Sequence, residues 1–147
     1  MSFKAKLKVA GKEYNVLSVS YGLFQETDPT GRPSTVTRGG KIDITVEGTG
    51  ETDLFEWMTN SFERKDGCVV FVKRDSDATL KELKFTEGYL VKHKENFDST
   101  GKNPLTESFT ISAHVTLERL HYPGMEGAAH QILLQTRCSI HHHCSNV

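Results

Sequence analysis

Apolar and polar residues alternate along much of the chain, which is the pattern of β-strands with one buried and one solvated face. In the run Phe3–Val9 the odd positions are apolar and the even positions carry lysines. Residues 41–47 repeat the pattern, with isoleucine and valine pointing one way and polar residues the other. Residues 108–117 alternate in the same way. We predict a strand in each of these runs.

Three further runs depart from strict alternation. In residues 14–24 the apolar set shifts by one position after Val16, which predicts a β-bulge. Residues 68–73 are apolar on both faces and predict a central strand, in which the Cys68 thiol is expected to be buried and inert. In the next run Gly88 allows a bend, and four apolar residues are predicted to share the core face: Leu83, Phe85, Tyr89 and Val91.

One helix is predicted from the sequence. Either Thr52 or Asp53 can cap its start, and the helical pattern continues over Leu54–Phe62. Apolar residues recur at the spacing of a helix with one inward face. That face is predicted to pack against the strands and to hold Leu54, Trp57, Met58, Ser61 and Phe62.

The alternation weakens after Leu120. Residues 131–135 are predicted to form a last strand and residues 137–147 a polar tail. We expect a mainly β fold, a small antiparallel β barrel or sandwich of about six or seven strands with one short flanking α-helix. Residues 1–122 are assigned to this domain. Residues 123–147 are assigned to a C-terminal extension, part of which is interpreted as a cloning or frame artefact.

A long polar segment separates two of the predicted strands. Residues 25–40 hold two of the four prolines and three of the glycines. Within them, Asp28-Pro29-Thr30-Gly31 is a turn signal. Loops of this length in compact domains are usually functional or disordered. A functional role for this segment therefore needs support from elsewhere.

Composition and charge argue against a nucleic-acid-binding protein and against a membrane protein. The chain has 147 residues, of which 18 are basic and 19 acidic, so its net charge is −1 with histidine neutral. Nucleic-acid binding through phosphate contacts would need a basic excess. No apolar run approaches the ~20 residues of a membrane span. The start of the chain lacks the apolar stretch of a cleavable export signal. We therefore expect no nucleic-acid partner and no membrane insertion, and export would need another route.

The cysteines and histidines do not predict a metal site. Three cysteines are an odd number and do not form a disulfide framework. Cys138 and Cys144 flank three histidines, and thiolates and imidazoles are ligands for zinc or nickel. No second ligand pair elsewhere would complete a structural zinc site. The run is therefore interpreted as a polar tail, and neither a metal nor another cofactor is expected.

No catalytic signature is present. The carboxylates are scattered and expected in turns or at outward strand positions, with no pair suited to general acid–base catalysis. The frame of a P-loop and the Gly-x-Ser-x-Gly elbow are both missing. His93, His114 and His121 fall on or just after predicted strands and are expected to be solvated or capped rather than ligands. The chain is therefore not expected to be an enzyme.

The order of several segments points to a known family. They are Ser2–Val9, Tyr14–Tyr21, the loop residues Asp28, Gly31, Arg32 and Pro33, then Gly39–Ile42, Leu54–Met58, Thr86–Tyr89 and Phe109–Ala113. Together they resemble the Bacteroidetes form of the type VI secretion tube protein, the Hcp-like subunit TssD. The resemblance covers roughly residues 2–113. From His114 onward the chain departs from the family pattern.

The resemblance implies a structural rather than a catalytic role. Homohexameric rings of such subunits stack into a hollow tube, and a contractile sheath drives this tube, tipped by a spike protein, into a neighbouring cell. Effector proteins could travel in the tube. The resemblance implies assembly in the cytoplasm, followed by secretion through the type VI machine without a signal peptide.

The resemblance also implies that the polar loop grips the next ring. The inter-ring contact is expected to involve Asp28, Thr30, Gly31, Arg32, Pro33, Thr37 and Arg38, with the arginines bonding to facing carboxylates. Three other functions stay open. A phage-like tail-tube subunit shares the architecture. A monomeric small-ligand-binding β barrel would need a sizeable apolar cavity, and an enzyme on a β sandwich would need titratable groups clustered in a cleft.

Overall fold

The computed structural model describes residues 3–119 and 132–134 of the chain. The described strands pair only in the antiparallel sense. In chain order the elements are β1 (Phe3–Val9), β2 (Lys12–Tyr21), β3 (Lys41–Glu47), α1 (Asp53–Thr59), β4 (Lys65–Lys73), β5 (Thr79–Phe97), β6 (Leu105–Arg119) and β7 (Ile132–Leu134).

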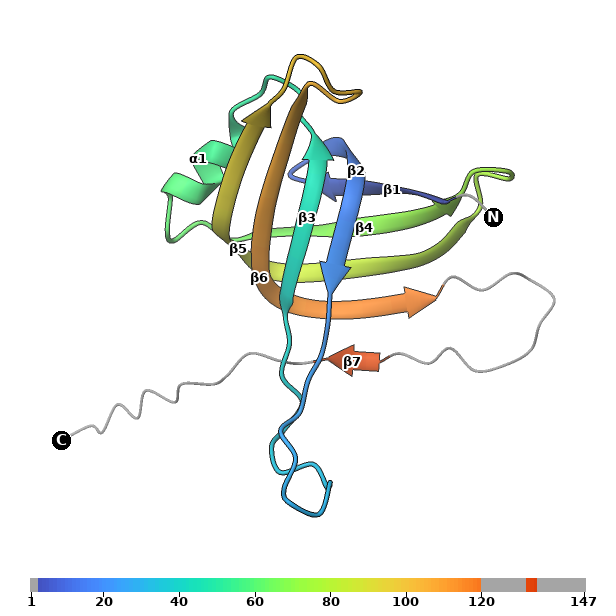
Figure 1. The fold of residues 1–147 in the computed structure, drawn as a ribbon, viewed down its shortest axis with the longest axis vertical. Helices are drawn as coiled ribbons and strands as arrows, with labels where there is room; N and C mark the ends of the chain where they lie inside the picture. The colour runs from blue at the N-terminus through green and yellow to red at the C-terminus, as the bar shows by residue number, and fades with distance from the viewer. Residues whose placement is uncertain (1–2, 120–131, 135–147) are drawn as a thin grey trace.

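Hydrogen-bonded pairing closes the strands from β3 round to β6 into a barrel. The sheet runs in the order β3-β2-β1-β4-β5-β6-β7, and β3 also pairs with β6, so the sheet returns to its start (Figure 1). β7 lies outside this closed set and pairs with residues 115–117 of β6. The expected mainly β barrel with a short flanking helix is confirmed, and the predicted last strand is present as β7.

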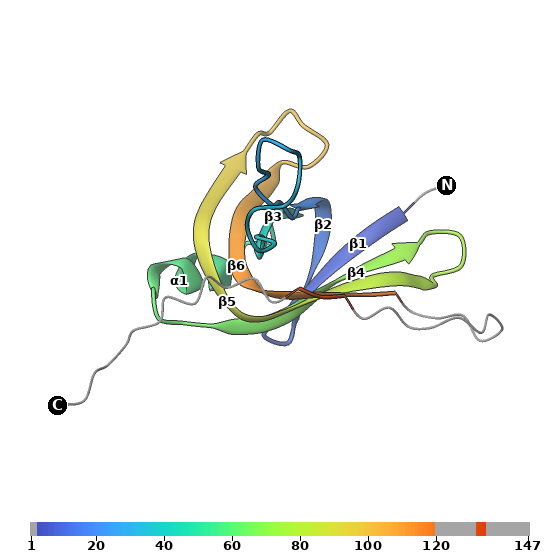
Figure 2. The same cartoon turned by 90° about the horizontal axis from the view of Figure 1, so that it is seen from below.

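Two long, bent strands each form part of two walls of the barrel. β5 has 19 residues and β6 has 15, and both curve sharply in the two views (Figures 1 and 2). The first part of β5 pairs with β4 as far as Gly88. The second part pairs with residues 105–112 of β6, and nearly the same stretch of β6 pairs with β3 on its other side.

A bulge in β5 makes this bend possible. The pairing register between β5 and β6 shifts between Thr86 and Tyr89. In between, Glu87 has a φ of 52°, a left-handed conformation that is rare for a residue other than glycine. The backbone N–H of Glu87 donates to the carboxylate of Asp66 at 2.7 Å. This contact from β4 helps to hold β5 in its bent form.

The bulge also changes which residues of β5 face the core. Leu83 and Phe85 lie before it and are both 1% exposed. Beyond it Leu90 is 7% exposed, whereas Val91 is 47% exposed. The prediction that Val91 shares the core face is therefore wrong. An inserted residue shifts the alternation by one position and sends the following side chains to opposite faces.

One core joins every barrel strand to the helix. The alternation predicted for β3 is confirmed, and so is that of β6 from Phe109 to Val115, because their inward positions are buried. In β1, Leu7 and Val9 are buried as predicted, but Phe3 at the start of the strand is 48% exposed. The predicted bulge in the second strand is also present, since the register of β2 on β3 shifts between Val16 and Ser18. The fully buried large side chains are Trp57, Phe85, Leu7, Ile42, Ile44, Leu83, Ile111, Val46 and Val69.

The helix is shorter than predicted. It ends at Thr59 because Asn60 takes an extended conformation, with φ −98° and ψ 95°. Leu54 and Trp57 are buried as predicted, but Phe62 is 91% exposed and does not belong to the inward face. The Trp57 indole N–H donates to the backbone carbonyl of Glu63 at 3.1 Å. This hydrogen bond ties the segment that follows the helix back to the helix.

Cys68 lies on a central strand, as predicted. Its strand β4 pairs with β1 on one side and with β5 on the other. The Cys68 side chain is only partly buried, so the prediction of a fully buried thiol is wrong. This partial burial, together with the nearby Glu82, raises the pKa of the thiol to about 11. The thiol is therefore protonated at neutral pH and a poor nucleophile.

The close approach of β1, β4 and β5 requires glycine at position 67. A Cβ atom there would lie 2.5 Å from the carbonyl oxygen of Lys8 and 2.6 Å from Cζ of Phe85. We expect Gly67→Ala to lower the free energy of unfolding by about 2 kcal/mol, because the strands would have to move apart. Urea unfolding followed by Trp57 fluorescence measures this change.

Gly22 provides the matched control for this substitution. A Cβ atom there meets nothing within 4 Å. Gly22→Ala should change the free energy of unfolding by no more than about 0.5 kcal/mol. If both variants unfold at the same urea concentration, the close approach at Gly67 does not constrain the barrel.

Candidate functional site

A long loop projects from the barrel between β2 and β3, at the bottom of Figure 1. Its two arms pair with each other as a narrow ribbon. Phe24 and Arg38 exchange backbone hydrogen bonds of 2.9 and 2.8 Å, and the Ser34 N–H donates to the Glu26 carbonyl at 2.7 Å. Thr27 forms a further bridge with Pro33. The loop therefore has its own backbone order without a hydrophobic core.

The tip of the loop is organised by one carboxylate. Oδ1 of Asp28 accepts hydrogen bonds from the Thr30 hydroxyl at 2.6 Å, the Thr30 N–H at 2.9 Å and the Arg32 N–H at 3.0 Å. These donors, the Thr30 hydroxyl first, hold the pKa of Asp28 below its usual value. Gly31 completes the turn with a φ of 83° and donates its N–H to the Asp28 carbonyl at 3.0 Å.

The residues predicted for the inter-ring contact divide into two places along the loop. Asp28, Thr30, Gly31, Arg32 and Pro33 lie together at the tip. Thr37 and Arg38 lie near the base instead.

At the base, the Arg38 guanidinium lies 3.8 Å from the carboxylate of Glu26. No pattern in the sequence indicated a partner for Arg38 at Glu26. The prediction that the second strand continues to Phe24 is wrong, because β2 ends at Tyr21 and both Leu23 and Phe24 are exposed. Val36, to which no role was assigned, is exposed as well.

The opposite end of the barrel carries a turn of the same chemistry. In the connection between β5 and β6, the Asp98 carboxylate accepts from the Thr100 hydroxyl at 2.6 Å and from the Thr100 N–H at 3.0 Å. The Gly101 N–H reaches the Asp98 carbonyl at 3.4 Å. The sequence Asp-x-Thr-Gly, present at 28–31 and again at 98–101, is the signal that would have linked the two turns.

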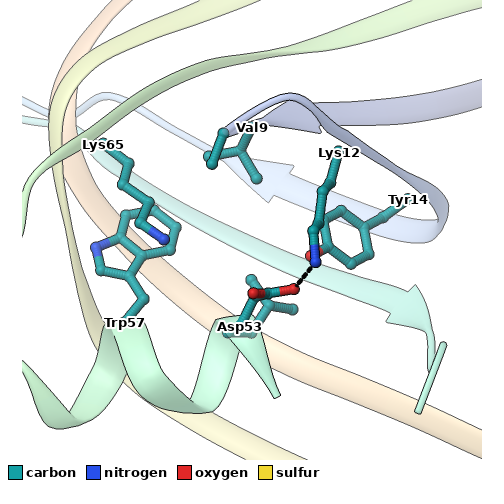
Figure 3. Close-up of a pocket in the computed structure, with 8 residues that line it drawn as sticks. Val9, Lys12, Tyr14, Asp53, Trp57 and Lys65 are labelled. Carbon is teal, nitrogen blue, oxygen red and sulfur yellow. Dashed lines mark hydrogen bonds and ion pairs between the residues drawn. The ribbon is translucent and has the colours of Figure 1, made fainter. Parts of the chain in front are cut away.

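A small pocket lies where the helix meets the turn between β1 and β2 (Figure 3). Lys12 bonds to the carboxylates of Asp53 and of Glu51, the latter at 2.7 Å, and both raise the pKa of Lys12. Nζ of Lys65 lies 5.4 Å from the centre of the Trp57 ring. The pocket measures about 60 Å³. Ligand sites of ~300 Å³ or more hold small molecules, so this pocket is too small for a lipid or a sugar.

A buried acid–histidine pair lies under the helix. Nε2 of His93 is 3.1 Å from the carboxylate of Glu107, and their side chains are only 6% and 5% exposed. The rings of Phe55 and His93 lie nearly perpendicular to each other, with their centres 6.1 Å apart. His93 is therefore not at the solvated face. The prediction that the carboxylates lie in turns or at outward strand positions is wrong for Glu107. In the sequence, Glu107 lies two and four positions before Phe109 and Ile111, so all three side chains are on the same face of β6. This spacing could have predicted that Glu107 is buried.

Of the other predicted candidates, the structure describes His114 but not His121 or the cysteine–histidine run. The His114 side chain is 32% exposed, with Nε2 3.5 Å from the Glu87 carboxylate. His121 and the run from Cys138 to Cys144 lie outside the described residues. Within residues 3–119 and 132–134, no group of three or more acidic, histidine or cysteine residues could hold a metal ion. No helix in that part of the chain is long and apolar enough to span a membrane.

Comparisons with known proteins agree with this architecture. The family model described as "Hemolysin coregulated protein Hcp (TssD)" matches residues 1–119. Hcp1 from Flavobacterium johnsoniae is 63% identical and has a TM-score of 0.73, with 87% of this chain and 98% of that chain covered. No curated protein sequence matches the chain.

A more distant solved structure shares the fold. Hcp1 from Salmonella typhimurium has a TM-score of 0.69 at 17% identity, with 89% of this chain and 93% of that chain covered. A type VI secretion system effector from Yersinia pestis has a TM-score of 0.62 at 13% identity, with 82% and 92% covered. At such identities the likeness extends to the fold alone.

The buried pair under the helix should contribute strongly to stability. His93→Ala leaves the Glu107 carboxylate buried without its imidazole partner, so we expect the free energy of unfolding to fall by about 3 kcal/mol. The partly exposed His114 is the control, and His114→Ala should cost no more than about 0.5 kcal/mol. Urea unfolding measures both, and equal losses in the two variants would contradict a structural role for the pair.

The ionised Asp28 should hold the tip of the loop rigid. Because its pKa is lowered in the folded protein, its stabilising effect is present above the ordinary carboxyl pKa and is lost as pH falls through the lowered value. In Asp28→Ala we expect lower backbone order parameters at Thr30 and Arg32 by nitrogen-15 relaxation at neutral pH. Asp98→Ala should leave these two residues unchanged. Unchanged order in Asp28→Ala would show that the paired arms alone organise the tip.

Proposed function

The chain belongs to the Hcp (TssD) family of type VI secretion tube proteins and is a tube subunit, and from this premise we propose that its loop joins stacked rings. In this proposal copies close sideways into a homohexameric ring, and rings stack head to tail through residues 22–40. A head-to-tail contact that does not close gives an open filament. The observation that carries the proposal is the ordered loop, which extends from the barrel without contributing to its core (Figure 1).

The filled barrel supports a channel that runs between subunits rather than through one. Core side chains from every barrel strand occupy the interior. The lumen of the tube is therefore lined by outer faces of the strands, which carry mixed charges. Ion pairs such as Lys6–Glu13 and Lys84–Glu118 lie on these faces. A wall of paired charges presents neither a strongly basic nor a strongly acidic surface to a passing effector.

The remaining partners follow from the same proposal. A contractile sheath surrounds the tube, a spike protein tips it, and effector proteins travel with it into the target cell. The subunit assembles in the cytoplasm and leaves through the type VI machine without a signal peptide. It acts without catalysis and without a cofactor. The burial of His93 and Glu107 supports this, because a substrate has no access to that pair.

The other functions have less support. A small-ligand-binding barrel needs an internal cavity, but core side chains fill the barrel and the pocket beside the helix measures only about 60 Å³. A phage-like tail-tube subunit would share the fold. The match to the TssD family model over residues 1–119 favours the secretion tube.

Shortening the loop tests the proposal. We replace residues 25–37 with Asn-Gly, which keeps the Phe24–Arg38 pair as the last rung of the hairpin. We expect hexameric rings of normal thermal stability, because the loop contributes nothing to the core, but no stacked tubes. Size-exclusion chromatography measures the rings, and negative-stain microscopy measures tube length.

A second loop replacement is the matched control. Residues 74–78 connect β4 to β5, and residues 74–77 of this connection can also be replaced with Asn-Gly. That variant should form tubes of normal length. Tubes of unchanged length from the variant lacking residues 25–37 would refute the role of the loop in stacking.

A further inference from the structure

One oxygen of the Asp28 carboxylate is engaged in three hydrogen bonds within the tip of the loop. A carboxylate that organises its own turn gains less from an intermolecular partner, which would have to compete with those donors. The matching turn at Asp98 is organised in the same way. Polar contacts between the two kinds of turn therefore offer a weak basis for stacking.

Apolar side chains near the base of the loop are exposed without a covering surface in the barrel. Leu23 is 48% exposed, Phe24 58% and Val36 80%. None of them belongs to the core cluster or packs against it. We call these three residues the apolar stem. Exposed apolar groups held on an ordered ribbon are typical of a protein–protein contact.

The opposite end of the barrel also presents an exposed aromatic ring. β5 ends at Phe97, whose side chain is 74% exposed. In Figure 1 this end of β5 lies at the top of the long axis and the loop lies at the bottom. In the view along that axis, the loop and the connection between β5 and β6 overlap (Figure 2). A copy shifted along the long axis would therefore bring its loop toward the Phe97 end of its neighbour.

We propose that the apolar stem of one subunit packs against the Phe97 end of a subunit in the next ring, and that this apolar contact, rather than the polar tip, supplies most of the stacking affinity. The inference rests on the proposed function of the loop. The two surfaces differ, as a head-to-tail contact requires. The contact repeats around each ring, so a modest affinity per subunit becomes a strong one between rings.

Substitutions on both surfaces test the contact. We expect F24S/V36S rings and F97S rings each to need at least about tenfold higher protein concentration for stacking, because buried apolar anchors dominate such interfaces. Sedimentation velocity of purified rings measures that concentration. Phe62, 91% exposed between α1 and β4, is the matched control, and F62S should stack normally. Loss of stacking in F62S as well would overturn the inference.

The polar alternative predicts different behaviour. If ion pairs from Arg32 dominated, R32A would lose stacking as strongly as F24S/V36S, and salt would weaken the stacking of unmodified rings. An apolar contact predicts a small effect of R32A and persistent stacking between about 0.05 and about 0.5 M salt. Loss of stacking in R32A, or by added salt, would overturn the inference.

Mixing the two defective rings tests whether the surfaces are partners. An F97S ring keeps its apolar stem, and an F24S/V36S ring keeps its Phe97 end. Mixed after assembly, they should form pairs of rings but no long tubes, because each pair has only one intact contact. The absence of ring pairs would overturn the assignment.

The loop replacement separates this inference from the proposed function. If F24S/V36S rings stack normally while the variant lacking residues 25–37 does not, the apolar contact is wrong and the loop function stands. If the loop-replacement variant itself stacks normally, the proposed role of residues 25–37 fails. Because that variant keeps Leu23 and Phe24, the F24S/V36S rings then decide the inference, which fails if they also stack normally.

Discussion

The architecture depends on the bulge that lets β5 bend out of its pairing with β4. At this point Glu87 takes a left-handed conformation. The next residue, Gly88, is closely packed: a Cβ atom there would lie 3.0 Å from both the Lys65 carbonyl oxygen and the Ile111 side chain. Beyond the bend, β5 pairs with the first half of β6, which in turn reaches β3. If β5 continued straight, β3 would lack a partner on one side and the sheet would stay open.

Because the barrel is closed and its interior is filled, the outer surface of the molecule is what can bind partners. Apolar side chains fill the interior, so the fold offers a rigid body rather than a cavity. The helix adds to this rigidity, because Trp57 enters the core and Lys12 bonds to Asp53 at its first residue. A rigid body with an ordered projection suits a tube subunit that assembles through contacts between copies.

The candidate site could be predicted in part. The position of the loop and its turn at Asp28 follow from local composition, because proline, glycine and aspartate favour turns for reasons internal to a few residues. The pairing of Phe24 with Arg38 could not be predicted in the same way, since it joins residues at the two ends of the loop. The three hydrogen bonds to Oδ1 of Asp28 also emerged only from the structure, and they underlie the proposal that the apolar stem supplies most of the stacking affinity.

By itself the sequence determined the strands and their faces wherever alternation was regular, as at Ile42 and Ile111, because a period of two is a local property of extended chain. Only the tertiary structure decided that Leu90 rather than Val91 enters the core, and that His93 and Glu107 are buried together. Both outcomes depend on contacts between segments far apart in the chain. A bulge is held by the neighbouring strand, and burial is imposed by whichever element covers the surface, here the helix.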